Sequence, residues 1–178
     1  AAMIGSSSLS GGDVADAAVI EEKLKADKAH KIKAVCIVHN ETSTGAMTPL
    51  KAIRKAIDDA RHPALYFVDS ISSLASMEYR HDDWGIDVTI GCSQKGLMVP
   101  PGLGLNAVGE KALAAYKTAK LPRYFWDWGL MAPSTEGNYP QTPAINLLFG
   151  LRASVDMLLE EGIDNTIARH TRLAEATR

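Results

Sequence analysis

Three short apolar runs, each followed closely by polar residues, most constrain the fold of this chain. They lie at residues 33–38, 64–68 and 86–90. The first run is continuous, which is typical of a strand that protein covers on both faces, and the other two are also expected to be strands. Between the first two runs, Leu50 and Ile53 begin a stripe of apolar residues at helical spacing. Strands that alternate with helices predict an α/β fold, with a mainly parallel sheet and flanking helices on both of its faces.

The remaining elements follow from periodicity and from residues that begin or end helices. Helices are expected at residues 14–27, 49–60, 110–117, 144–161 and 163–178, and a further strand at 103–108. Asp13 and Thr48 are the predicted N-caps, and Gly162 is the expected residue after a helix end. Residues 5–12 are rich in serine and glycine and predict a loop. The last two helices are expected to pack outside the sheet.

Composition limits the class of protein. Of the 178 residues, 46% are hydrophobic and 22% are charged, which is typical of a globular domain with a real core. The net charge of −2 argues against nucleic acid or an anionic membrane as a partner. No apolar run approaches the ~20 residues that span a bilayer. Cys36 and Cys92 lie in apolar runs without metal-ligand spacing, so we expect them to be buried in a reducing compartment.

Polar residues stand where the predicted strands end. Thr42 follows the first run, Asp69 follows the second, and Gln94 and Lys95 follow the third. Because the carboxyl ends of parallel strands meet at one sheet edge, we expect these residues to lie together at a ligand site. Small and apolar neighbours leave Lys95 few ways of being solvated, and desolvation lowers the pKa of an amine. A lysine and an aspartate at such an edge are typical of pyridoxal phosphate enzymes, in which the lysine carries the cofactor.

Each of these residues also has a purely structural interpretation. An aspartate after a strand is often a turn or cap residue. The hydroxyls of Thr42, Ser43 and Thr44 can all make turns with the backbone of their own loop. Most lysines are solvated surface charges. The joint position of these residues at one sheet edge is what favours a functional site.

Four segments together resemble a known family, the class V aminotransferases, which are pyridoxal phosphate enzymes of fold type I. The segments are His39-Asn-Glu-Thr-Ser-Thr-Gly45, Val68-Asp-Ser-Ile-Ser-Ser73, Gly91-Cys-Ser-Gln-Lys-Gly-Leu97 and Thr142-Pro-Ala-Ile145. Phe125-Trp-Asp-Trp128 and residues 160–173 narrow the resemblance to the serine–glyoxylate and alanine–glyoxylate enzymes. The likeness runs from about residue 13 to residue 178.

The resemblance implies a pyridoxal 5'-phosphate cofactor and a role for each matching residue. Lys95 matches the catalytic lysine that forms the Schiff base, and Asp69 matches the carboxylate that keeps the pyridine nitrogen protonated. Thr42 matches the residue whose hydroxyl bonds the phenolic oxygen of the cofactor, Gln94 matches a phosphate ligand, and Ile71 matches the apolar residue packed on one ring face. Tyr139 and Thr142 match residues that reach the cofactor phosphate of the neighbouring subunit. A homodimer is therefore expected, and no metal.

The activity implied is transfer of an amino group from serine, or alanine, to glyoxylate, which gives glycine and a 2-keto acid. The partners are then small amino acids and 2-oxo acids, and the compartment is the cytoplasm or, as an alternative, the peroxisome. The resemblance places residues 1–178 in part of the large cofactor-binding domain. Four features of the family would lie outside residues 1–178. They are the phosphate-binding turn, the tryptophan that stacks on the ring, the substrate-binding arginine and the small C-terminal domain. Alone, the chain is expected to be inactive.

Two other functions remain open at this stage. Cysteine desulfuration on the same scaffold would need a cysteine in a mobile loop, which Cys36 and Cys92 do not match. A non-catalytic, Rossmann-like binding module is disfavoured because no G-x-G-x-x-G opens a helix. His39 is expected to be satisfied by its loop rather than to act as a base. The aromatic cluster at 124–128 is expected in packing or at a subunit interface, and residues 81–83 in a solvated turn rather than a metal site.

Overall fold

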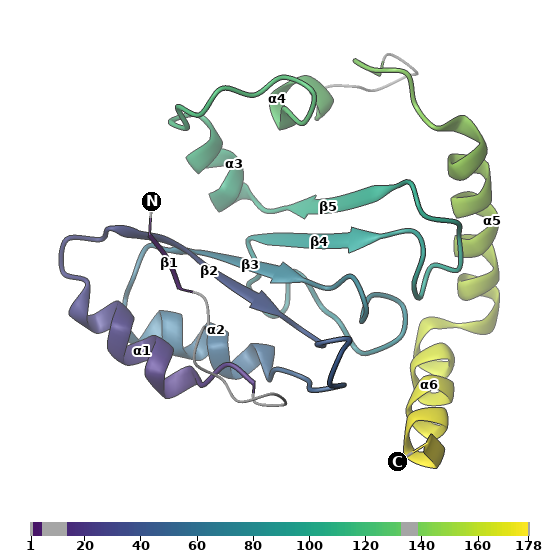
Figure 1. Ribbon diagram of the computed structural model, residues 1–178, viewed down its shortest axis with the longest axis horizontal. Helices are drawn as coiled ribbons and strands as arrows, with labels where there is room; N and C mark the ends of the chain where they lie inside the picture. The colour runs from purple at the N-terminus through teal and green to yellow at the C-terminus, as the bar shows by residue number, and fades with distance from the viewer. Residues whose placement is uncertain (1, 5–13, 133–138, 178) are drawn as a thin grey trace.

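The sheet of the computed structural model has five strands, whose order across the sheet is the order along the chain (Figure 1). The structure describes residues 2–4, 14–132 and 139–177. The strands are β1 (Ala2–Ile4), β2 (Ile32–Val38), β3 (Leu65–Asp69), β4 (Val88–Cys92) and β5 (Gly104–Val108). The first four are parallel, and β5 pairs antiparallel with β4. The predicted mainly parallel sheet is confirmed, although the sequence did not predict β1, and residues 5–12 lie outside the described ranges.

Six helices accompany the described sheet. They are α1 (Ala17–Ala26), α2 (Leu50–Asp59), α3 (Glu110–Tyr116), α4 (Trp128–Met131), α5 (Ile145–Glu161) and α6 (Ile163–Thr177). The predicted helices are confirmed to within a few residues, and Gly162, with φ of 86°, ends α5 as expected. The short helix α4 was not predicted. None of the helices in the described ranges is long and apolar enough to cross a membrane.

Both predicted N-caps are wrong. Asp16, not Asp13, caps α1, and its carboxylate accepts hydrogen bonds from the backbone N–H groups of Ala18 and Val19. Asp13 lies outside the described residues. Helix α2 begins one residue later than expected, with Pro49 in the cap position and no side-chain cap bond. The hydroxyl of Thr48 therefore does not cap the helix, and Thr48 is buried.

The main core lies on one face of the sheet, between the strands and helices α1 and α2, which cover that face (Figure 1). Right-handed crossovers that always step in the same direction place their helices on the same face. Since β1, β2 and β3 follow one another in order, α1 and α2 lie side by side and share this core. The core comprises Ile20, Leu24, Val35, Ile37, Leu50, Ile53, Ile57, Ala64, Tyr66, Val68, Trp84 and Ile86.

The opposite face of the sheet is less covered in the described structure than the sequence predicted. The paired residues Val38, Asp69 and Ile90 point to this face together, because partners in a parallel ladder share a side. Val38 is 42% exposed and Ile90 is 37% exposed. The expectation of helices over both faces came from the alternation of strands and helices along the chain, whereas the strand order decides which face each crossover helix covers.

Candidate active site

The carboxyl ends of β2, β3 and β4 meet at one edge of the sheet, as the sequence predicted (Figure 1). Three loops leave from this edge. The loop after β2 carries Thr42, the segment after β3 carries Ile71, and the loop after β4 carries Gln94 and Lys95. Asp69 is the last residue of β3. The structure thus brings five of the predicted site residues to the same sheet edge.

Asp69 combines the structural and the functional interpretation. One carboxylate oxygen, Oδ1, accepts a hydrogen bond of 2.9 Å from the backbone N–H of Ile71, so the side chain does form a turn. The backbone carbonyl of Asp69 accepts from the N–H of His39 at 2.9 Å. No partner of the second oxygen, Oδ2, is found among the described residues. A half-buried carboxylate is therefore held in place with one oxygen left to bind a cation.

The loop after β2 shows which of its three hydroxyls is free to act on a ligand. Ser43 donates from its hydroxyl to the Glu41 carboxylate at 2.8 Å, and the hydroxyl of Thr44 accepts from the N–H of Ala46 at 3.2 Å. These bonds confirm local turns for two of the hydroxyls. Within the described part of the chain the hydroxyl of Thr42 has no such bond, and the residue is exposed. The local turns thus spare the one hydroxyl that was assigned to the cofactor.

The loop after β4 holds Lys95 by a close backbone approach. The hydroxyl of Ser93 donates to the Pro100 carbonyl at 2.8 Å, and the N–H of Met98 donates to the Lys95 carbonyl at 2.8 Å. A Cβ on Gly96 would lie 2.2 Å from the carbonyl oxygen of Leu74, so only glycine fits beside the 74–76 backbone.

The side chains of Gln94 and Lys95 themselves are exposed. The expectation that apolar neighbours exclude water from Lys95 is therefore wrong for the described structure, because those neighbours pack beneath the loop and not around the amine. Neither side chain has a hydrogen-bond or ion-pair partner in the residues that the structure describes. The Lys95 amine is accessible to a ligand at this edge.

Tyr139 and Thr142 lie beside a segment, 133–138, that is outside the described residues, and both are exposed. No hydrogen bond links either of them to Lys95, Asp69 or Thr42 in the described chain. Their assignment to the cofactor of a neighbouring subunit stays a prediction.

His39 is a structural residue of the edge, although its imidazole bonds to the Ser73 side chain of the segment after β3 and not, as expected, to its own loop. Its side chain is only 3% exposed, and burial lowers the pKa of the imidazole. Nδ1 lies 2.9 Å from the hydroxyl of Ser73, and the ring contacts those of Tyr79 and Trp84 at centroid distances of 5.7 and 6.2 Å. The imidazole points into the core beneath the loops, so the structure supports packing rather than a catalytic base.

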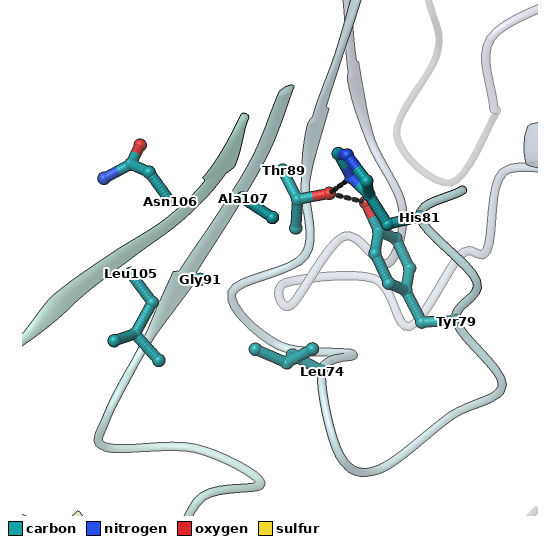
Figure 2. A pocket seen from close by; sticks show the side chains of 8 residues that line it. All are labelled: Leu74, Tyr79, His81, Thr89, Gly91, Leu105, Asn106 and Ala107. Atoms are coloured by element: carbon teal, nitrogen blue, oxygen red, sulfur yellow. Dashed lines mark hydrogen bonds between the residues drawn. The ribbon is translucent and has the colours of Figure 1, made fainter. Parts of the chain in front are cut away.

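Sequence reasoning missed a pocket between β4, β5 and the 74–81 segment (Figure 2). Its volume is about 340 Å³, and Leu74 and Leu105 supply its apolar walls. The hydroxyl of Thr89 lies 2.6 Å from the hydroxyl of Tyr79 and 2.7 Å from Nδ1 of His81. The expectation of a fully solvated turn at 81–83 is therefore wrong for His81, which is half-buried. No spacing in the sequence indicates that a strand threonine would hold both rings.

Both cysteines lie in strands of the sheet, whereas a mobile nucleophile would have to lie in a flexible loop. Cys92, in β4, is buried, and its thiol lies 3.7 Å from the Ile71 carbonyl. Cys36, in β2, is half-buried, and burial raises the pKa of its thiol. In the described residues no group of three or more metal-binding side chains forms a metal site. This geometry gives no support to cysteine desulfuration.

Comparison with known proteins adds the family. The family model described as Aminotransferase class-V matches residues 14–178. The chain is 47% identical over 169 residues to serine–glyoxylate aminotransferase of Arabidopsis thaliana, a match that covers 94% of this chain and 42% of that protein. It is 48% identical over 159 residues to L-aspartate–glyoxylate aminotransferase of Paracoccus denitrificans, with 89% and 40% covered.

A solved structure agrees with these sequence relatives. The structure of pyridoxamine–pyruvate aminotransferase from Mesorhizobium loti matches with a TM-score of 0.84 at 30% identity, covering 96% of this chain and 43% of that chain. The α/β sheet of this chain carries an amine, a carboxylate and a hydroxyl at the carboxyl ends of its parallel strands. This is the place where proteins of the α/β class bind ligands. The match over residues 14–178 shows that the chain belongs to the class V aminotransferase family. It spans about two fifths of the length of these relatives, 42% of the first of them.

The cofactor of this family is pyridoxal 5'-phosphate, and the residues of the edge fit it. The cofactor offers an aldehyde, a pyridine nitrogen, a phenolic oxygen and a phosphate. The Lys95 amine, the Asp69 Oδ2 and the Thr42 hydroxyl are groups left without partners in the described structure, and they suit the first three. The sequence predicted these residues, and the structure adds that neighbouring polar groups do not compete for them.

Proposed function

We propose that this chain forms part of the large cofactor-binding domain of a pyridoxal-phosphate-dependent transaminase that uses glyoxylate as amino acceptor. The amino donor is serine, with alanine as the alternative. The observation that carries the proposal is the set of unpartnered groups at one edge of the described sheet, namely the Lys95 amine, the Asp69 carboxylate oxygen and the Thr42 hydroxyl. Two relatives whose names include glyoxylate support the acceptor.

The bound cofactor supplies an electron sink for the bond that breaks at the substrate α-carbon. Lys95 would hold the cofactor through its amine and, when that amine is free, would take the proton from the substrate α-carbon as general base and return a proton as general acid. Asp69 keeps a proton on the pyridine nitrogen by the favourable interaction of its negative charge. The Thr42 hydroxyl would donate to the phenolic oxygen, the Gln94 amide would donate to the phosphate, and Ile71 would pack on the ring.

Completion of the site requires a second subunit in this proposal. Tyr139 and Thr142 then reach the phosphate bound by the neighbouring protomer, which makes the protein a homodimer. Their exposure and their position just before α5 are compatible with an interface. The exposed aromatic side chains of Tyr124, Phe125 and Trp126 supply further contact area of the kind that interfaces favour.

The donor is tested by steady-state kinetics with the full-length protein. Serine, alanine, aspartate and cysteine are compared at fixed glyoxylate, and glycine formation is measured. We expect the highest kcat/KM with serine. A ranking led by alanine or by aspartate assigns a different donor, and release of sulfide from cysteine without glycine contradicts transamination.

The attachment residue is tested separately. Borohydride reduction of the full-length protein with its cofactor is expected to attach the cofactor covalently, as a label, to the peptide that contains Lys95. Lys111 is a suitable internal comparison, because its amine donates to the Ala64 carbonyl at 2.7 Å and is not free. A label on Lys111 or Lys120 would show that the assignment of Lys95 is wrong.

A further inference from the structure

Asn40 and Ser72 join two of the loops that leave the site edge. Asn40 stands two residues after β2, at the start of the loop that carries Thr42. Ser72 stands three residues after Asp69, in the segment that follows β3. The Asn40 side-chain amide donates from Nδ2 to the Ser72 hydroxyl oxygen at 3.0 Å, and the Ser72 hydroxyl donates to the Asn40 backbone carbonyl at 2.6 Å. Two part-buried hydrogen bonds therefore join the same pair of residues.

This pair requires an amide and a hydroxyl and tolerates few substitutes. The single hydrogen of the Ser72 hydroxyl is used by the Asn40 carbonyl, so the same oxygen must accept from whatever faces it. An amide N–H₂ can donate there, whereas a carboxylate would place two acceptors together. Asn40→Asp is thus nearly isosteric but removes the side-chain bond of the pair, while the backbone carbonyl of residue 40 stays available to the Ser72 hydroxyl. Ser72→Thr keeps both bonds.

Further bonds make the connection between the two loops rigid. His39 donates from its backbone N–H to the Asp69 carbonyl at 2.9 Å, and its ring nitrogen Nδ1 lies 2.9 Å from the hydroxyl of Ser73. The bridge between Asn40 and Met47 joins the two ends of the Thr42 loop. The loop is thereby fixed to the segment that begins with Asp69.

We propose that Asn40 and Ser72 are positioning residues, which set the Thr42 hydroxyl at the correct distance from the Asp69 carboxylate. This inference rests on the proposed function, because both groups act on the cofactor there. Thr42 is exposed and its side chain has no bond of its own in the described residues, so its place depends on the anchoring of its loop. The two bonds of the pair fix the end of the loop that is nearer to Asp69.

The test uses full-length protein loaded with pyridoxal phosphate and two readouts other than turnover. One is the dissociation constant of the cofactor. The other is the pH midpoint at which the visible absorbance of the bound cofactor changes, which responds to the groups around its ring. Ser72→Ala removes both part-buried hydrogen bonds and Asn40→Asp removes one of them, and each is expected to weaken cofactor binding about tenfold. Both are expected to shift the midpoint in the direction that Thr42→Val shifts it.

Two controls separate positioning from general stability. The single variant Ser72→Thr keeps the hydroxyl and is expected to have the wild-type midpoint. Ser43→Ala removes a hydroxyl from the same loop that bonds only to Glu41 in the described structure, and it is expected to leave the midpoint unchanged. In a Thr42→Val background, Ser72→Ala is expected to cause no further shift, because the group that it positions is gone.

The outcomes distinguish this inference from the proposed function. If the wild-type protein neither binds the cofactor nor forms glycine, the proposed function is wrong. If the wild-type protein does both, but Asn40→Asp and Ser72→Ala leave the midpoint unchanged, the positioning role is overturned. An equal shift from Ser72→Ala with and without Thr42 also overturns it, since the effect would then not pass through Thr42.

Discussion

Only one oxygen of Asp69 is used by the turn after β3 in the described structure, so its structural role can be separated from the electronic role that we propose for it. Asn in its place keeps an acceptor for the Ile71 N–H, so the turn after β3 is retained, but it removes the negative charge. We expect Asp69→Asn in the full-length protein to reduce kcat/KM by about 10²-fold or more with nearly unchanged melting temperature. The matched control is Asp156→Asn, which removes an exposed carboxylate paired with Arg152 on α5. A large fall in melting temperature with normal activity per folded molecule would show a structural role instead.

Individual residues also show what a sequence can and cannot predict. Asp69 and Lys95 could be placed at one sheet edge from the sequence because strand ends are visible as the ends of apolar runs, and parallel strands bring those ends together. The exposure of Lys95 could not be predicted, because it depends on contacts between segments far apart in sequence. Asp13 and Asp16 are equally good caps by residue type, and only the backbone conformation selects Asp16. The contacts of His81 and Tyr79 with Thr89 have no periodic signal at all.

Among the elements, the loop between β4 and β5 depends most on a single glycine. A Cβ at Gly96 would clash with the backbone carbonyl of Leu74, which cannot rotate away as a side chain could. We expect Gly96→Ala to destabilise the protein by about 1–3 kcal/mol, as overpacking does, and to reduce cofactor binding by moving Lys95. Gly104→Ala, in β5, is the control, because nothing lies within 4 Å of the position that its Cβ would take. Chemical denaturation of both variants measures the difference, and equal effects would refute the steric argument.

The junction of α5 and α6 predicts a pH dependence. The Arg169 guanidinium donates to both oxygens of Glu161, at 2.7 and 2.8 Å, and lowers the pKa of that carboxyl from 4.5 to about 2. A carboxyl with a lowered pKa stabilises the folded state above its unfolded pKa and stops doing so as pH falls through the folded value. Between pH 4.5 and 2 the amides of α6 should lose protection from hydrogen exchange. Glu161→Gln should show less protection at neutral pH and a smaller acid-dependent loss, and an unchanged profile would contradict the prediction.

At the scale of the whole molecule, the exposed site residues and the thinly covered second face indicate how much this chain can do alone. Val38 and Ile90 are exposed apolar residues beside Asp69, and the amine of Lys95 is open to water. We expect residues 1–178, expressed alone, to bind pyridoxal phosphate much more weakly than the full-length protein and to aggregate more readily. Cofactor titration and light scattering measure this. Tight binding with near-normal turnover would show that residues 1–178 hold a complete site.

The one-directional order of the strands has a consequence for how the molecule folds. Each of β2, β3, β4 and β5 pairs with the strand that precedes it in the chain, so every pairing closes a short stretch of polypeptide. Pairing between strands that are consecutive in the chain costs less loop-closure entropy than pairing between strands far apart in sequence. The sheet can therefore grow in the order in which a ribosome releases it, with α1 and α2 docking as their strands arrive. The edge that holds Asp69 and Lys95 is then assembled progressively during synthesis, and Lys95 joins it only when β4 has paired.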